Sequence, residues 1–83
     1  MNVVISPKAA KYLKRLNEPQ KGRIIKALEQ LAKEPLEGDI KSLSGRDGYR
    51  LRVGDYRILF DIFDNEIAVH DIGLRGQIYK GRR

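Results

Sequence analysis

Residues 49–60 read YRLRVGDYRILF, and apolar and basic side chains alternate through the first half of this stretch. Gly54-Asp55 is a two-residue turn signal between two β-prone runs, which predicts a β-hairpin. In that hairpin Arg52 lies opposite Arg57, and Arg50 shares their face. Because successive side chains of a strand point to opposite faces, the apolar residues cover the core and the three arginines converge on the other side.

The arginines of this hairpin are unfavourable neighbours unless something offsets their repulsion. Like charges directly across a strand pair destabilise a sheet, so the cluster predicts an anionic ligand or carboxylate partners. Asp55 and Asp61 are near enough in sequence to act as such partners. The alternative interpretation is a solvated polar face of a half-exposed antiparallel sheet, without a ligand.

A second turn signal, Asp64-Asn65, precedes another β-prone run at Ile67–Ile72. Pairing across this turn brings further residues to the arginine side, namely Leu59, Ala68, His70 and Ile72. A face that mixes arginines with apolar side chains resembles a binding groove more than a solvent face. A longer loop through Glu66 would shift the register and move His70 away. His70 is the one histidine of the chain, and we interpret it as structural rather than as an acid, base or metal ligand.

The N-terminal half predicts a strand followed by two helices. Asn2–Ile5 is a short β-prone run, and Ser6-Pro7 suits the N-cap and first position of a helix. The first helix ends near residues 17–19 and the second near Pro35, which disfavours helical geometry before it. The apolar stripes of the two helices are Ala9, Tyr12, Leu13 and Leu16, and Ile24, Ile25, Leu28, Leu31 and Ala32. We expect a helical hairpin packed through these stripes, with Gly22 allowing a close approach between the helices.

Two segments are expected to lack regular structure. Residues 35–48 are rich in Gly, Ser and charge and predict a connecting loop, and residues 73–79 predict a loop or edge segment. Glycines on either side of Arg75 allow the backbone to aim its guanidinium back across the sheet. A guanidinium can bind a phosphate and a tyrosine such as Tyr79 can stack on a base or exchange a proton at a ribose oxygen. The alternatives are a loop charge at Arg75 and a packing aromatic at Tyr79.

Composition limits the class of protein. The 83 residues predict one small domain, residues 1–83, of α+β class, in which any site lies on a face or groove. The formal charge is +6, from 17 Lys and Arg against 11 Asp and Glu, and this excess suits a polyanion such as nucleic acid or the ribosome. The absence of cysteine excludes disulfides and thiol chemistry. The sequence lacks a signal peptide or membrane span, so we expect a cytoplasmic protein without membrane contact.

The run Tyr49–Phe60, together with Ile72-Gly73-Leu74-Arg75 and Ile78-Tyr79, resembles the RelE/ParE family of bacterial toxin-antitoxin toxins. The resemblance extends over nearly the whole chain. It implies the RelE-like microbial RNase fold, in which an N-terminal strand and a helical hairpin precede an antiparallel β-meander. The RelE branch cleaves mRNA in the ribosomal A site without a metal, by attack of a ribose 2′-OH on the adjacent phosphate. The ParE branch shares the fold and inhibits DNA gyrase, and the basic residues and tyrosine here favour the RelE branch.

Functional roles carry over from the resemblance by position. They make Arg50 and Arg52 RNA-binding residues and Arg57, Arg75 and Tyr79 catalytic residues. RelE itself has lysines on the second strand of the meander, whereas this chain has arginines, which are poor general bases. Tyr79 is therefore expected to deprotonate the 2′-OH, while Arg57 and Arg75 neutralise the charge that develops on the phosphate. Tyr79→Phe and Arg57→Ala are each expected to slow cleavage at least about tenfold and to leave the fold intact.

The resemblance also implies partners. A cognate RelB-like antitoxin would pack a helix or strand on this domain, and the ribosome and mRNA would be the targets. No metal, cofactor or small molecule is expected. Two alternatives stay open, a ParE-like toxin that inhibits gyrase without nuclease activity and a non-toxic relic that binds an antitoxin. Growth arrest with DNA damage signalling and intact mRNA would identify the first alternative, and antitoxin binding without a growth defect would identify the second.

Overall fold

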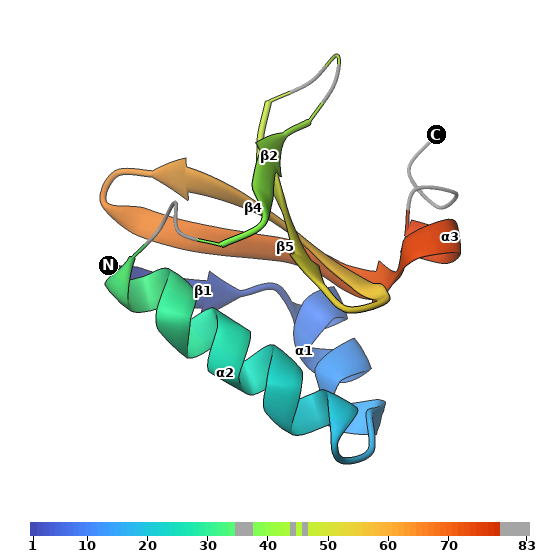
Figure 1. The fold of residues 1–83 in the computed structure, drawn as a ribbon. Coiled ribbons are helices and arrows are strands. Elements are labelled where there is room, and N and C mark those ends of the chain that lie inside the picture. Colours follow the sequence, from blue (N-terminus) through green and yellow to red (C-terminus); the bar gives the residue numbers. More distant parts are fainter. Residues whose placement is uncertain (35–37, 44, 46, 79–83) are drawn as a thin grey trace.

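The chain folds into a five-stranded sheet with two helices packed on one face (Figure 1). The computed structural model describes residues 1–34, 38–43, 45 and 47–78. In chain order the elements are β1 (Asn2–Ile5), α1 (Pro7–Arg15), α2 (Gln20–Lys33), β2 (Ile40–Ser42), β3 (Tyr49–Val53), β4 (Tyr56–Phe63), β5 (Glu66–Leu74) and α3 (Arg75–Ile78). The strands lie in the order β1-β5-β4-β3-β2, so β1 and β2 form the two edges. This architecture confirms the expected α+β class.

The first strand and first helix join as the sequence predicts. β1 runs parallel to β5, with Val3 opposite Ile67. The Ser6 N–H continues this pairing by donating to the Val69 carbonyl oxygen at 2.9 Å. The Ser6 hydroxyl oxygen accepts a hydrogen bond from the Ala9 N–H at 3.1 Å, which satisfies one of the N–H groups that a helix start leaves unpaired. The predicted N-cap is confirmed.

Both helices pack against the sheet and form one core with it, but the predicted stripe of α2 is only partly confirmed, because Ile25 is exposed and Ala27 packs against the core instead. The fully buried members of this core are Ala9, Ile24, Leu28, Leu31, Leu51, Ile58, Phe60, Ile67, Val69 and Ile72. Every second residue of β3 and β4 faces the helices and contributes to this core, because successive side chains of a strand point to opposite faces. No helix that the structure describes is long and apolar enough to cross a membrane.

The structure differs from the sequence expectations in three segments. Gly22 does not serve a close approach of the helices, because the atoms nearest to an added Cβ belong to Glu18 in the turn, with Oε1 at 2.8 Å. Residues 40–42, expected in a loop, form the edge strand β2 because Ile40 packs partly buried against the core and pairs with Leu51. Residues 75–78 form the short helix α3 rather than a loop, because the buried Ile78 packs on the sheet at Gly73, where a Cβ would lie 3.3 Å away.

The strand registers decide which residues lie on the face away from the helices. Between β3 and β4 the predicted register is confirmed, with Val53 opposite Tyr56 across the Gly54-Asp55 turn. Between β4 and β5 it holds from Phe63 opposite Glu66 to Phe60 opposite Val69, and then a β-bulge shifts it. Beyond the bulge Ile72 pairs with Ile58 and joins the core, so its predicted place on the arginine side is wrong. A bulge adds one residue to one strand and so exchanges the faces of everything after it.

Two phenylalanines of β4 provide a matched test of this core. Phe60 is 1% exposed and Phe63 is 76% exposed. Removing a buried aromatic ring leaves a cavity and costs about 3–5 kcal/mol, whereas a surface change away from other features stays within about 0.5 kcal/mol. Phe60→Ala is therefore expected to lower the denaturation midpoint strongly and Phe63→Ala to leave it nearly unchanged, as measured by urea unfolding. Equal losses from the two variants would contradict the orientation of β4.

Candidate nucleic-acid interface

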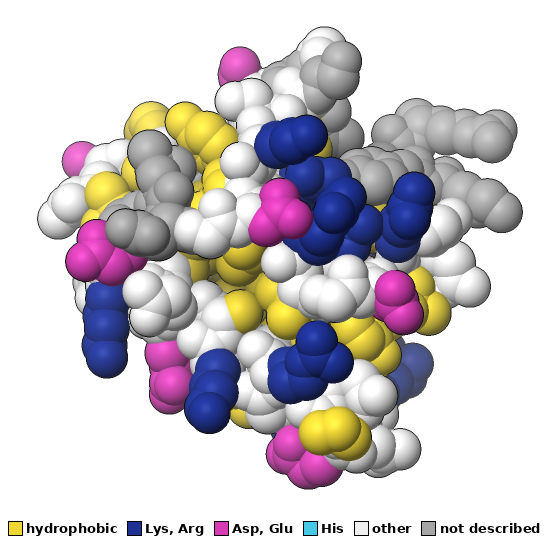
Figure 2. All heavy atoms as spheres, in the orientation of Figure 1, with side chains coloured by type: hydrophobic (Ala, Val, Ile, Leu, Met, Phe, Trp, Pro, Cys, Tyr) yellow, Lys and Arg dark blue, Asp and Glu magenta, His cyan; other side chains and the backbone are white. Residues whose placement is uncertain are grey.

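Arg50, Arg52 and Arg57 lie on the sheet surface opposite α1 and α2, which we call the arginine face. The register places Arg52 opposite Arg57 and Arg50 opposite Leu59, as predicted from the hairpin. Figure 2 shows Lys and Arg side chains clustered over the region of β2 and β3, with an acidic side chain against them. The backbone therefore brings together the three arginines that the sequence analysis selected, and their side chains differ in exposure and partners.

Arg57 is buried at the turn between β3 and β4. Only 3% of this residue is exposed. Its Nη1 donates to the carbonyl oxygens of Gly54 at 3.0 Å and Tyr56 at 2.9 Å, so the side chain folds back over the hairpin end. Backbone carbonyl oxygens therefore satisfy the hydrogen-bond donors of Nη1. Arg57 thus supplies positive charge beneath the surface and fixes the shape of the turn.

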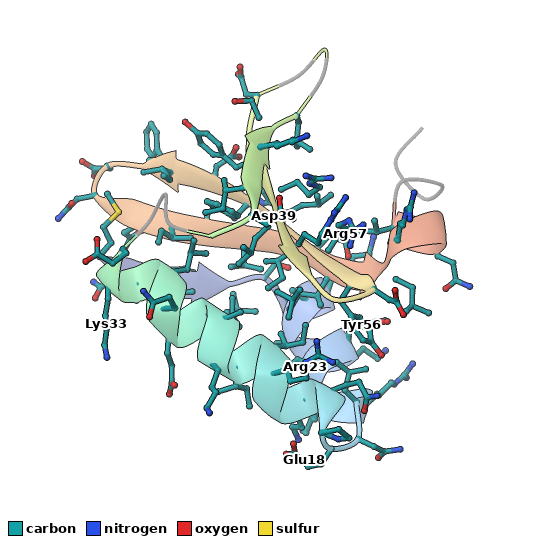
Figure 3. All side chains as sticks on the ribbon, viewed as in Figure 1. Glu18, Arg23, Lys33, Asp39, Tyr56 and Arg57 are labelled. Atoms are coloured by element: carbon teal, nitrogen blue, oxygen red, sulfur yellow. The ribbon has the colours of Figure 1, made fainter. Side chains whose placement is uncertain are left out.

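Asp39 supplies a carboxylate beside both Arg50 and Arg52. Its Oδ2 lies 3.4 Å from Nε of Arg52, and its Oδ1 lies 3.8 Å from Nη2 of Arg50. The Arg52 N–H also donates to the Asp39 carbonyl oxygen at 3.0 Å, which aligns Asp39 with β3 just before β2 begins. Figure 3 labels Asp39 beside β2 and Arg57 toward the β3–β4 turn. The Asp39 carboxylate therefore partly neutralises this pair of arginines.

The guanidinium of Arg50 has unmet hydrogen-bonding capacity. Its side chain is 16% exposed, and its Nε and Nη2 are buried without a hydrogen-bond partner among the residues that the structure describes. A buried donor left unpaired costs about 1–3 kcal/mol, more when it is charged. Two such donors on one guanidinium can be satisfied by a planar arrangement of acceptor oxygens, as on a phosphate or carboxylate.

Helix α3 brings Arg75 to the same end of the sheet. The Arg75 N–H donates to the Asp55 carbonyl oxygen at 2.9 Å, which ties the start of α3 to the β3–β4 turn. Gly73, opposite Arg57, lies beneath Ile78 and leaves room for it. The exposed Arg75 is therefore held next to the turn that carries Arg52 and Arg57, as its position between glycines suggested. Tyr79, the remaining predicted catalytic residue, lies outside the described residues.

Two further cations lie near these arginines, Lys41 on the same face and Arg23 at the hairpin end, and the sequence analysis missed both. Lys41 of β2 lies opposite Arg50, and no pairing signal in the expected loop pointed to it. Arg23 of α2 reaches the hairpin end, where its Nη2 would lie 3.0 Å from a Cβ at Gly54. Figure 3 labels Arg23 beneath this turn. Its basic character was visible in the sequence, but only the packing of α2 on the sheet places it there.

The predicted partner Asp61 binds a histidine. Its Oδ2 lies 2.6 Å from Nε2 of His70, the residue at which the register of β5 shifts. Both side chains are partly exposed, at 39% and 44%. Asp55, the other expected partner, contributes its backbone carbonyl to Arg75. The arginine face thus carries a cationic part near the β3–β4 turn and a His-Asp pair farther along β4.

A small basic domain with helices on one sheet face and arginines on the other has the architecture of the RelE/ParE toxin superfamily. The sequence model of the ParE toxin family, described as the ParE toxin of a type II toxin-antitoxin system, matches residues 3–79. The chain belongs to this family and is a toxin of a type II toxin-antitoxin system. No curated protein sequence matches the chain significantly.

Solved structures of related toxins share nearly the whole fold. The RelE-RelB complex of the archaeon Pyrococcus horikoshii contains a chain 28% identical, with a TM-score of 0.80 over 92% of this chain and 96% of that one. The RelB-RelE complex of Methanococcus jannaschii contains one 26% identical, with a TM-score of 0.79 over 96% and 99%. The isolated RelE toxin of Escherichia coli, 20% identical with a TM-score of 0.75 over 96% and 92%, shows the fold alone. The predicted RelE-like fold is confirmed.

The place of Asp39 predicts that its charge opposes binding of an anion. The carboxylate is half-exposed beside two arginines, where a charge contributes about 1 kcal/mol. Asp39→Asn is therefore expected to bind a short single-stranded RNA about fivefold more tightly, as measured by fluorescence anisotropy. Asp64→Asn, the same change in the β4–β5 turn, is the control. Equal affinities of the two variants would show that Asp39 does not occupy the anion site.

The burial of Arg57 adds a stability role to its expected function. Arg57→Ala leaves the carbonyl oxygens of Gly54 and Tyr56 without this donor, so we expect a loss of about 1–3 kcal/mol in the free energy of unfolding. Arg52 lies opposite Arg57 and is exposed, so Arg52→Ala is expected to change the free energy of unfolding by no more than about 0.5 kcal/mol. Urea unfolding of both variants tests this difference, and a stable Arg57→Ala protein would contradict it.

Proposed function

We propose that this toxin is an endoribonuclease that cleaves mRNA on the ribosome. The observation that carries the proposal is the arginine face, where Arg52 is exposed and two guanidinium nitrogens of Arg50 lack a hydrogen-bond partner among the described residues. These groups are suited to the phosphates of RNA, which bind guanidinium groups through paired hydrogen bonds. The RelE chains of the two archaeal complexes, similar over nearly their whole length, support the same assignment.

The role that we assign to each residue follows from how exposed its side chain is. Arg50 and Arg52 bind phosphates of the message or of ribosomal RNA, and Lys41 adds charge beside them. Arg75, exposed at the start of α3, approaches the scissile phosphate from the hairpin end. Arg57 acts from beneath the surface through its charge, because its Nη1 is bound to the turn. Tyr79 remains a candidate base for the reaction.

The proposed reaction needs no group beyond RNA and protein. A ribose 2′-oxygen attacks the adjacent phosphorus, its proton passes to a base, and the bond from phosphorus to the 5′-oxygen breaks. The products are a 2′,3′-cyclic phosphate and a 5′-hydroxyl, whose proton comes from an acid or from water. Guanidinium groups fixed around the phosphate stabilise the additional negative charge of the transition state.

The open shape of the site explains why a ribosome would be required. The arginines lie on a sheet surface of a domain with a radius of gyration of 11.8 Å. A surface of this kind binds RNA but does not hold the 2′-oxygen in line with the bond that breaks. Orientation of reacting groups contributes several kcal/mol to catalysis, and the ribosome would supply it by holding the message in its A site. We therefore expect slow cleavage of free RNA.

A cognate antitoxin is the second proposed partner. The archaeal relatives were solved as RelE-RelB complexes, which supports a RelB-like protein here. Acidic side chains of such a partner would pair with the arginine face as Asp39 does. Its apolar side chains would cover Val4 of the edge strand β1 and Ile25 of α2, which are 49% and 38% exposed.

Inhibition of DNA gyrase is the second candidate function. The match of the ParE toxin family over residues 3–79 favours it. A gyrase inhibitor needs a binding surface but no base or acid, so the arginine face would bind a protein or DNA. Expression would then stop growth with DNA damage signalling and leave mRNA intact.

Mapping of 5′ ends in cellular mRNA after induced expression tests the nuclease function. We expect new ends within translated codons, and about a tenfold or larger loss of these ends in Arg52→Ala and Arg75→Ala, because each removes a charge that binds phosphate. Arg15→Ala, an exposed arginine at the end of α1, is the matched control and should cleave like the parent. Growth arrest without new mRNA ends would overturn the nuclease function and indicate that the toxin inhibits gyrase or another target.

A further inference from the structure

The only histidine of the chain lies on the arginine face, at the β-bulge of β5. His70 is the extra residue between the pairs Phe60 with Val69 and Leu59 with Asp71. Its Nε2 lies 2.6 Å from Oδ2 of Asp61, which shares its side of β4 with Arg57. Bulges often re-aim a side chain near a functional site. Here the residue at the bulge is a histidine whose imidazole lies beside a carboxylate, on the surface assigned to RNA.

Gly48 makes room for this pair. Its φ is +115°, in the left-handed region that favours glycine, and an added Cβ would lie 2.7 Å from Oδ1 of Asp61. A distance below 3.0 Å requires one of the two groups to move. The carboxylate of Asp61 therefore occupies the side-chain space of Gly48 with one oxygen and binds His70 with the other. Such fixation is what orients a histidine for proton transfer.

The hydrogen bond determines which nitrogen of His70 is available. An ionised carboxylate can only accept a hydrogen bond, so Nε2 carries the hydrogen that is shared with Asp61. In the neutral imidazole Nδ1 then holds the lone pair. The side chain is 44% exposed, which leaves the ring accessible to a bound ligand. A carboxylate that fixes the tautomer of a histidine in this way prepares it to act as a general base.

The position relative to the arginines suits a ribose beside a bound phosphate. Arg50 lies opposite Leu59, so Asp61 is its diagonal neighbour across the strand pair, at roughly 7–8 Å. His70 lies on the next strand, within about 10 Å of β3 by the spacing of strands. RNA phosphates bound to Arg50 and Arg52 would place an adjoining ribose toward His70.

The other polar groups of this region are less suited to accept the proton. Arginines remain protonated at all relevant pH values. Tyr12 lies on the helix side of the sheet, and burial, with smaller contributions from Tyr56 and Asp71, raises its pKa, so that it stays a phenol. The charged groups around His70 are Asp61 of β4 and Asp71 of its own strand, whose Oδ2 is 3.3 Å from Nζ of Lys8 in α1.

We propose that His70, oriented by Asp61, is the general base of this toxin in place of Tyr79, an inference that rests on the proposed endonuclease function. Nδ1 accepts the proton of the 2′-hydroxyl as the 2′-oxygen bonds to phosphorus. The bond from phosphorus to the 5′-oxygen breaks, and water protonates that oxygen. The imidazolium then returns its proton to solvent, and the cyclic phosphate leaves. His70 is in this scheme a catalytic residue and Asp61 a positioning residue.

Cleavage of mRNA on programmed ribosomes in vitro tests the proposal. We expect His70→Ala to lower the single-turnover rate about 100-fold, within the range of general-base catalysis, and free imidazole to restore part of it. Asp61→Asn should lower the rate at least about tenfold, whereas Asp64→Asn on the same hairpin should not. The parent rate should rise with pH between about 5 and 8, and this dependence should vanish in His70→Gln, whose amide can still donate to Asp61.

The outcomes separate the two proposals. Parent-like rates and pH dependence in His70→Ala and His70→Gln would overturn the role of His70 while leaving the endonuclease function in place. A rate loss in His70→Gln with an unchanged pH dependence and no imidazole rescue of His70→Ala would assign His70 a structural role and also overturn it. A parent protein that cleaves no message on ribosomes would overturn the endonuclease function and this inference together.

Discussion

The turn at Gly54 and Asp55 sets the register of β3 against β4, and a shift by one residue would exchange the two faces of this hairpin. Gly54 has a φ of +60°, which glycine adopts without strain. The carbonyl oxygens of both turn residues also accept hydrogen bonds. That of Gly54 accepts from Arg57, and that of Asp55 accepts from the Arg75 N–H. The same few atoms thus hold the arginines on one face and tie α3 to the sheet.

Much of the fold follows from local sequence because local signals decide it. The N-cap at Ser6, the apolar stripes and the strict alternation of β3 each involve residues close together in the chain. The register of β4 with β5 was predictable only as far as Val69, because a bulge has no fixed sequence signal. The edge strand β2 was not predicted either. Its residues have the composition of a loop, and they form a strand because they pair with β3.

The candidate site was less accessible to sequence analysis than the fold. The hairpin pattern correctly put three arginines on one face, but the partner of Arg50 and Arg52 is Asp39, which reaches them from within the expected loop. Arg57 belongs to the same face by register and yet is buried at the turn. Both findings depend on the direction that a long side chain takes among distant neighbours, and the spacing of residues does not determine that direction.

The repulsion between Arg52 and Arg57 explains how the arginine face is organised. Directly opposed like charges destabilise a strand pair, and the structure separates them by directing Arg57 to backbone oxygens and Arg52 to Asp39. The cationic part of the face therefore exists without an unbalanced repulsion. The His70-Asp61 pair lies beyond Leu59, outside this arrangement. Since most of the core lies on the opposite side of each strand, toxins that share the fold can change the exposed side chains of this face, and with them their chemistry, at little cost to stability.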